Sequence, residues 1–116
     1  MLGRSFRIRK QEDFERVFRG GKPLFFDDLG CKFLFVGGDA LRVGFSFSKK
    51  HIPLAVLRHR LRRRFSAALV LQKGNWPKGY DLVFFTVKKP KDVNYATIER
   101  ITKYCISAIN TVNKGK

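Results

Sequence analysis

One apolar stretch limits the folds open to this chain of 116 residues. The run Leu82-Val83-Phe84-Phe85-Thr86-Val87 is almost continuously apolar, and β-branched and aromatic residues dominate it. A strand of this kind is usually covered on both faces, whereas a half-exposed strand alternates apolar and polar residues. We therefore predict a central strand over residues 81–87. At about 100–200 residues per domain, the chain is expected to form one domain, residues 1–116.

Two further strands are predicted upstream, over residues 31–36 and 42–48. In the second of them Val43, Phe45 and Phe47 alternate with small or polar residues, which is the pattern of a half-buried strand. Gly37-Gly38-Asp39 between the two strands is a turn signal. We expect these two strands to pair as a hairpin.

Three helices are predicted from apolar positions at helical spacing. The first covers residues 11–19, where Phe14, Val17 and Phe18 share one face and Gly20-Gly21 ends the helix. The second covers residues 54–71, and its apolar stripe consists of Leu54, Leu57, Leu61, Phe65 and Ala68. The third runs from Asn94, a plausible N-cap, to Val112, and its stripe consists of Ile98, Ile101, Cys105, Ala108, Ile109 and Val112.

These elements predict an α+β fold, a two-layer α/β sandwich. The strand–helix–strand unit over residues 42–87 suggests a parallel pair in a small mixed sheet, with the helices packed on one side.

The charge of the chain decides its class of partner. Lys and Arg number 25 and Asp and Glu number 9, which gives a formal net charge of +16. Between Asp39 and Asp81 no acidic residue interrupts the basic ones, a footprint typical of phosphate binding. The hydrophobic share of 44% excludes a disordered basic tail. A basic helix on a membrane surface is the rival explanation for this charge. Such a helix has little need of other elements, whereas the apolar helix face here has strands to pack on, which favours nucleic acid.

No run approaches the roughly 20 apolar residues that span a bilayer, and the first residues lack a signal-peptide pattern. We expect a soluble, cytoplasmic protein with no membrane partner. Cys31 and Cys105 are expected to be buried thiols without a disulfide partner, and no metal-ligand spacing is present. His51 and His59 lack a nucleophile or carboxylate at any diagnostic spacing, so no catalytic residue is assigned.

Two residue clusters suit RNA. Arg58-His59-Arg60-Leu61-Arg62-Arg63-Arg64, preceded by Ser48-Lys49-Lys50, can track a phosphate backbone with arginine forks. The aromatic residues Phe14, Phe18, Phe33 and Phe35 can form either a stacking surface for unpaired bases or part of the core. The sequence pattern leaves both readings open.

In order and spacing, these segments resemble the bacterial ribonuclease P protein family. The tract Arg58-His59-Arg60-Leu61-Arg62-Arg63 resembles its Arg-Asn-Arg-x-Lys-Arg signature. Four other segments are also similar to segments of the family: Arg42-Val43-Gly44-Phe45-Ser46-Phe47-Ser48-Lys49-Lys50, Glu12-Asp13-Phe14-Glu15-Arg16-Val17-Phe18, Leu82-Val83-Phe84-Phe85 and Asn94-Tyr95. The resemblance implies a fold like domain 2 of ribosomal protein S5, with a left-handed βαβ crossover.

The resemblance also implies a function. In that family an RNA subunit, which requires Mg²⁺, cleaves the 5′ leader from precursor tRNA, and the protein is an accessory subunit of this endonuclease. By position, the residues implied to bind the RNA subunit are Lys49, Lys50, Arg58, His59, Arg60, Arg62 and Arg63. Those implied to line a cleft for the leader are Phe14, Phe18 and Phe35.

Two positions depart from the family pattern. His59 stands where the family usually has Asn, and it replaces an amide contact with an imidazole whose charge depends on pH. Ser66 stands where many members carry a basic residue. The alternative functions are a structural, ribosomal-type RNA-binding protein that takes part in no reaction and a protein-only nuclease that uses His51 or His59.

Overall fold

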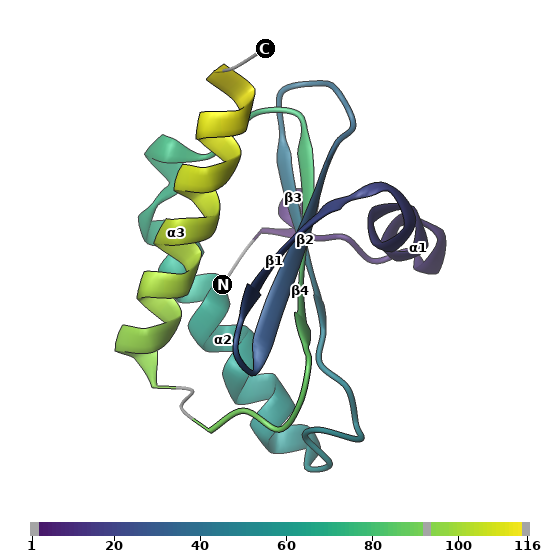
Figure 1. The fold of residues 1–116 in the computed structure, drawn as a ribbon, viewed down its shortest axis with the longest axis vertical. Helices are drawn as coiled ribbons and strands as arrows, with labels where there is room; N and C mark the ends of the chain where they lie inside the picture. The colour runs from purple at the N-terminus through teal and green to yellow at the C-terminus, as the bar shows by residue number, and fades with distance from the viewer. Residues whose placement is uncertain (1–2, 92–93, 115–116) are drawn as a thin grey trace.

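The computed structural model describes residues 3–91 and 94–114 and consists of a four-stranded sheet with helices on both faces (Figure 1). In chain order the elements are the 3-10 helix η1 (Arg4–Phe6), α1 (Gln11–Gly20), β1 (Lys22–Phe26), β2 (Leu29–Phe35), β3 (Leu41–Ser46), α2 (Ala55–Leu71), the 3-10 helix η2 (Lys73–Asn75), β4 (Tyr80–Thr86) and α3 (Tyr95–Lys114). The predicted mixed sheet and α+β class are confirmed.

The strand order is β1-β2-β4-β3, so the predicted central strand is confirmed. β4 pairs antiparallel with β2 and parallel with β3. The unit β3–α2–β4 is the predicted strand–helix–strand unit. Its left-handed sense, implied by the resemblance, stays a prediction.

The predicted hairpin between β2 and β3 is wrong, because β4 lies between these two strands. β4 takes this place since its residues are apolar on both faces, and a central position covers both. The hairpin partner of β2 is instead β1, which the sequence patterns missed. β1 contains Pro23, which lacks an N–H for a ladder and is therefore confined to an edge strand such as this one.

Helices α2 and α3 cover one face of the sheet and α1 lies against the other (Figure 1). On the first face the Phe65 and Phe84 rings are 4.7 Å apart, at the centre of the main core. On the second face Val17 of α1 packs with Val83 and Ile8. The prediction that all helices lie on one side is therefore wrong for α1, since the second apolar face of β4 also needs a cover.

The apolar stripe of α2 is buried over only part of its length. Leu61, Phe65 and Ala68 are buried as predicted, whereas Leu54 and Leu57 are 61% and 40% exposed. The first turn of α2 extends past the end of the strands, so the sheet does not cover these two leucines (Figure 1).

Two smaller predictions are confirmed. The Asn94 side chain accepts a hydrogen bond of 2.9 Å from the Thr97 N–H, as expected of an N-cap. Cys31 and Cys105 are free, buried thiols whose sulfur atoms lie 3.1 Å apart. The hydrogen bond with Cys31 and burial together raise the pKa of the Cys105 thiol. Within the described part of the chain no helix is long and apolar enough to cross a membrane.

An ion-pair network connects α1 to the middle of the sheet. Arg42 and Asp81 are partners in the β3–β4 register, and the guanidinium donates to both carboxylate oxygens, at 2.9 and 2.6 Å. Arg42 also lies 3.5 Å from the carboxylate of Asp13 in α1. The hydrogen bond to Asp81, which is fully buried, raises the pKa of Arg42. This network fixes where α1 sits on the sheet.

Candidate nucleic-acid interface

The loop between β3 and α2 presents Lys49 and Lys50 to solvent. The Thr86 hydroxyl accepts from the Ser48 N–H at 3.0 Å and lies 2.9 Å from Nδ1 of His51. The Ser48 side chain accepts from the Lys50 N–H at 3.1 Å. These bonds hold the loop on the end of β4, so both exposed lysines stand on a fixed backbone beside the first turn of α2.

Arg58 differs from the other arginines of α2. Its Nη1 donates to the Ile52 carbonyl at 2.8 Å and to the Pro53 carbonyl at 3.0 Å, and the side chain is half-buried. The guanidinium of Arg58, a predicted RNA-binding residue, therefore holds the loop that leads into α2. Its role includes positioning this loop.

The remaining predicted basic residues divide over different sides of α2. His59, Arg60 and Arg63 are exposed, whereas Arg62 is half-buried and Ser66 is buried. His59, Arg62 and Ser66 line the flank that faces the N-terminal segment, and Arg60 and Arg64 line the opposite flank. Arginine forks are well suited to phosphate, and their distribution gives α2 two basic flanks with an exposed face between them.

The aromatic residues of α1 lie on the other face of the sheet. Phe14 is half-buried, and its ring lies directly over Gly44 of β3, where an added Cβ would be 2.7 Å from the ring. The Phe18 ring is 5.8 Å from Phe85 of β4, which in turn is 6.2 Å from Phe25 of β1. Phe25 is 64% exposed. Phe14 and Phe18 are each packed on the sheet and keep part of their surface open, and their role in stacking on bases stays a prediction.

Lys32 adds a cation to this aromatic row. Its Nζ donates to the Phe18 carbonyl at 2.8 Å, at the C-terminal part of α1, and lies 5.6 Å from the centre of the Phe18 ring. A cation beside open aromatic rings is a combination found in sites for unpaired nucleic-acid strands.

A hollow of about 400 Å³ joins the two predicted clusters. It lies between the N-terminal segment, α1, β3 and α2, and is lined by Arg7, Ile8, Arg9, Phe14, Val43, Gly44, Phe45, His59, Arg62 and Ser66. The N-terminal segment is held beside β3 because the Ile8 N–H donates to the Val43 carbonyl at 2.9 Å. The hollow therefore places His59 and Arg62 of α2 beside Phe14 of α1.

Phe35 does not lie with Phe14 and Phe18. Along β2 it alternates onto the face that carries Phe33, and its ring packs 5.4 Å from Tyr80. The prediction that Phe35 lies with Phe14 and Phe18 is therefore wrong. Side chains alternate along β2, so Phe33 and Phe35 point toward the sheet face that α3 covers, whereas α1 covers the other face. Phe33 is buried in the main core.

The structure adds residues that the motifs did not reveal. Arg7 and Arg9 border the hollow, and Lys32, Phe25 and Phe85 extend the aromatic row. The density of arginine in the first ten residues was the only signal for Arg7 and Arg9. For the other three, pairing of β1, β2 and β4 decides that they meet.

The surroundings of the two histidines and of the acidic residues can be described directly. In residues 3–91 and 94–114, no group of three or more His, Cys, Asp or Glu residues is placed to hold a metal ion. The Nδ1 atom of His51 is engaged with Thr86, and His59 stands exposed among arginines.

Comparison with known proteins decides the family. The sequence profile of the Ribonuclease P family matches residues 2–110. The chain belongs to the ribonuclease P protein family. A ribonuclease P protein component from Clostridium novyi is 40% identical over 101 residues, which cover 84% of this chain and 88% of that protein. One from Alkaliphilus oremlandii is 31% identical over 109 residues, covering 94% of this chain and 95% of that protein.

Solved structures agree with this assignment. The ribonuclease P protein of Thermotoga maritima superposes with a TM-score of 0.71 at 28% identity, covering 84% of this chain and 93% of that one. The Staphylococcus aureus protein shares the fold, with a TM-score of 0.76 at 23% identity and coverage of 90% and 94%. As a ribonuclease P protein, this chain is a subunit of an endoribonuclease whose partner is ribonuclease P RNA. It functions in tRNA processing.

Gly44→Ala is expected to lower the free energy of unfolding by about 1–3 kcal/mol, since the new Cβ would overlap the Phe14 ring. Urea denaturation measures this change. Gly74→Ala is the matched control, because no atom lies within 4 Å of its added Cβ, and it should change stability by less than about 0.5 kcal/mol. Adding Phe14→Leu to Gly44→Ala should recover part of the loss. Full stability of Gly44→Ala would contradict the described packing of α1 on β3.

Proposed function

We propose that this protein uses two parts of one interface for two RNA ligands. The basic residues of α2 and its preceding loop bind ribonuclease P RNA: the exposed Lys49, Lys50, His59, Arg60 and Arg63 and the half-buried Arg62, with Arg58 holding the loop. The aromatic surface beside α1, with Phe14 and Phe18, binds the single-stranded 5′ leader of precursor tRNA. The hollow between α1 and α2, lined by Phe14 and Arg62, is the observation that carries this proposal.

Physical reasons support this division. Folded RNA presents a dense phosphate surface, which forked arginine donors on a rigid helix can follow without reading bases. An unpaired leader exposes base faces, and half-open aromatic rings next to Lys32 suit those faces. The hollow places the two surfaces next to each other, so the leader can lie beside the bound RNA subunit.

The chemistry of cleavage is assigned to the RNA subunit and the Mg²⁺ ions that it requires. The protein, with a formal net charge of +16, lowers the repulsion between the two RNA molecules and holds the leader in place. Less Mg²⁺ is then needed to bring them together. The protein acts in the cytoplasm, where precursor tRNA is processed in bacteria.

Reconstitution tests who performs the reaction. Precursor tRNA is incubated at low, near-physiological Mg²⁺ with bacterial ribonuclease P RNA alone, with the protein alone, and with both. We expect cleavage at the mature 5′ end only when both are present. Cleavage by the protein alone would establish a protein nuclease, and no gain from folded protein with a matched RNA would favour a structural RNA-binding protein.

Arg63→Ala is expected to weaken binding to ribonuclease P RNA without changing stability, because Arg63 is exposed on α2. The slope of log K against log salt concentration should fall by about one, as for the loss of a single phosphate contact. Filter binding at several salt concentrations measures both quantities. Lys78→Ala, in the loop after η2, removes an equal charge elsewhere and should bind normally. Unchanged affinity and slope for Arg63→Ala would remove the exposed face of α2 from the interface.

Phe18→Leu is expected to weaken binding of precursor tRNA by roughly tenfold, through the loss of base stacking, while binding of mature tRNA stays unchanged. The ratio of the two dissociation constants is measured with the assembled complex. Phe26→Leu alters a half-buried ring on the other sheet face, beside Tyr104, and serves as the control. Equal losses for precursor and mature tRNA would show that Phe18 acts only through folding.

A further inference from the structure

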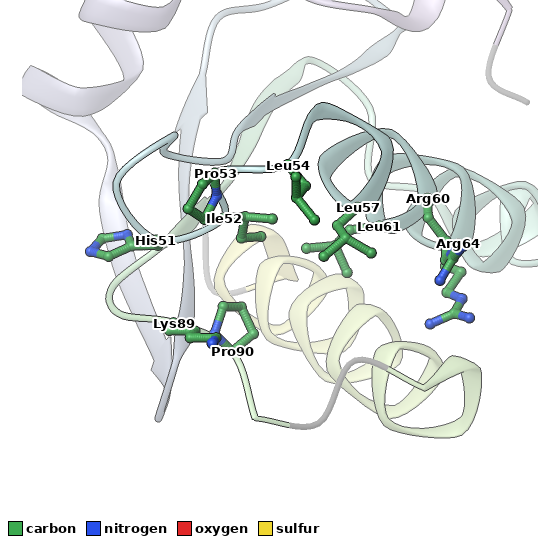
Figure 2. Close-up of a pocket in the computed structure, with 10 residues that line it drawn as sticks. All are labelled: His51, Ile52, Pro53, Leu54, Leu57, Arg60, Leu61, Arg64, Lys89 and Pro90. Atoms are coloured by element: carbon green, nitrogen blue, oxygen red, sulfur yellow. The ribbon is translucent and has the colours of Figure 1, made fainter.

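A second cavity lies on the opposite flank of α2 from the hollow, at the first turns of the helix (Figure 2). Its volume is about 360 Å³, and the loops 51–54 and 89–90 form its other walls. We propose that it receives one unpaired nucleotide of the RNA partner, with the base inside and the flanking phosphates on its basic ends. The proposal rests on the proposed function and deepens it, because it adds a contact with RNA that is separate from the aromatic surface proposed for the leader.

The walls of this cavity are apolar. They consist of Ile52, Pro53, Leu54, Leu57, Leu61 and Pro90. Leu54 and Leu57 are 61% and 40% exposed, so the cavity presents apolar surface to solvent that a ligand could cover. The flat faces of a base can pack against leucine and proline side chains, and this contact removes water from the base and from the side chains.

The two ends of the cavity are basic. In Figure 2, His51 and Lys89 lie at one end, Arg60 and Arg64 lie at the other, and the leucines lie between them. No acidic side chain is among the described residues that line it. A nucleotide within a strand has a phosphate on each side of its base-bearing sugar, so its charge pattern matches an apolar centre with a cation at each end.

Charge also selects among possible occupants. A formal net charge of +16 opposes docking of a second copy of this chain. An acidic peptide with a large apolar residue would match the cavity in charge, but continuity favours RNA. Lys49 and Lys50 belong to the same loop as His51, and the exposed Arg63 lies on α2 between the flank that carries His59 and the flank that carries Arg60. RNA held on the exposed face of α2 therefore needs only one extruded base to fill the cavity, and extruded bases are what proteins commonly recognise in folded RNA.

The first experiment compares ligands on the full chain by NMR titration. AMP, GMP, CMP and UMP are added in separate experiments, and ribose 5-phosphate and an acidic leucine-containing hexapeptide serve as competing classes. We expect at least one nucleotide to shift the amide signals around Leu57, Leu61 and Lys89, with an affinity about tenfold above that of ribose 5-phosphate. Equal affinity for ribose 5-phosphate, or binding of the peptide alone, would overturn the proposal.

The second experiment uses matched variants in the same titration and in binding to ribonuclease P RNA. Leu57→Gln changes a partly exposed cavity residue and is expected to weaken both kinds of binding by about tenfold, whereas Val56→Gln changes an exposed neighbour outside the cavity and should weaken neither. Lys89→Ala should weaken both more than Lys91→Ala does. Circular dichroism checks the fold of each variant.

The outcomes separate this inference from the proposed function. If Leu57→Gln and Lys89→Ala bind RNA like the unaltered protein while Arg63→Ala binds weakly, the nucleotide cavity is excluded and the proposed function stands. If all three bind normally, the RNA interface on α2 falls as well. If the cavity variants lose affinity for ribonuclease P RNA while the ratio of precursor to mature tRNA binding stays unchanged, the result supports a contact that is separate from the aromatic surface proposed for the leader.

Discussion

The ion pair between the half-buried Arg42 and the buried Asp81 is the interaction on which the arrangement of the interface depends. Asp81 is fully buried on the central strand, and a buried carboxylate is strongly destabilising unless a partner neutralises it. Arg42 supplies two hydrogen bonds from the parallel neighbour strand and reaches Asp13 of α1 as well. The same guanidinium thus matches the register of β3 to β4 and holds α1 on the sheet. That placement sets Phe14 over Gly44 and brings Phe18 to Phe85.

The excess of positive charge and the apolar core are kept apart in space. Helix α2 contributes Leu61, Phe65 and Leu69 to the core and presents arginine on its exposed face and both flanks. Crowded cations repel one another, and the RNA partner relieves this repulsion by supplying phosphates. The helix is consequently a rigid support for charge, and its two flanks lead to different surfaces: the aromatic surface beside α1 on one side and the apolar cavity on the other.

Much of the fold follows from local pattern. The helices, the central strand and the Asn94 cap were predictable because hydrophobic periodicity and side-chain capping act over a few residues. β1 escaped because Pro23 weakens a strand pattern, and the β2–β3 hairpin was wrong because pairing is a competition among strands distant in sequence. For the interface, the arginine tract and Phe14 and Phe18 were identified, whereas Lys32 and Phe85 required knowledge of which strands meet.

The sequence by itself determined the class of partner, the three α-helices and the central strand. Net charge is a property of composition, and each amphipathic pattern is a property of its own segment. Only the tertiary structure decided which side chains share a surface. It separated Phe35 from Phe14 and Phe18, gave Arg58 a positioning role and joined α1 to the flank of α2 that carries Arg62. The physical reason is that strand order and helix docking are set by the joint burial of both faces of β4, and no single segment contains that information.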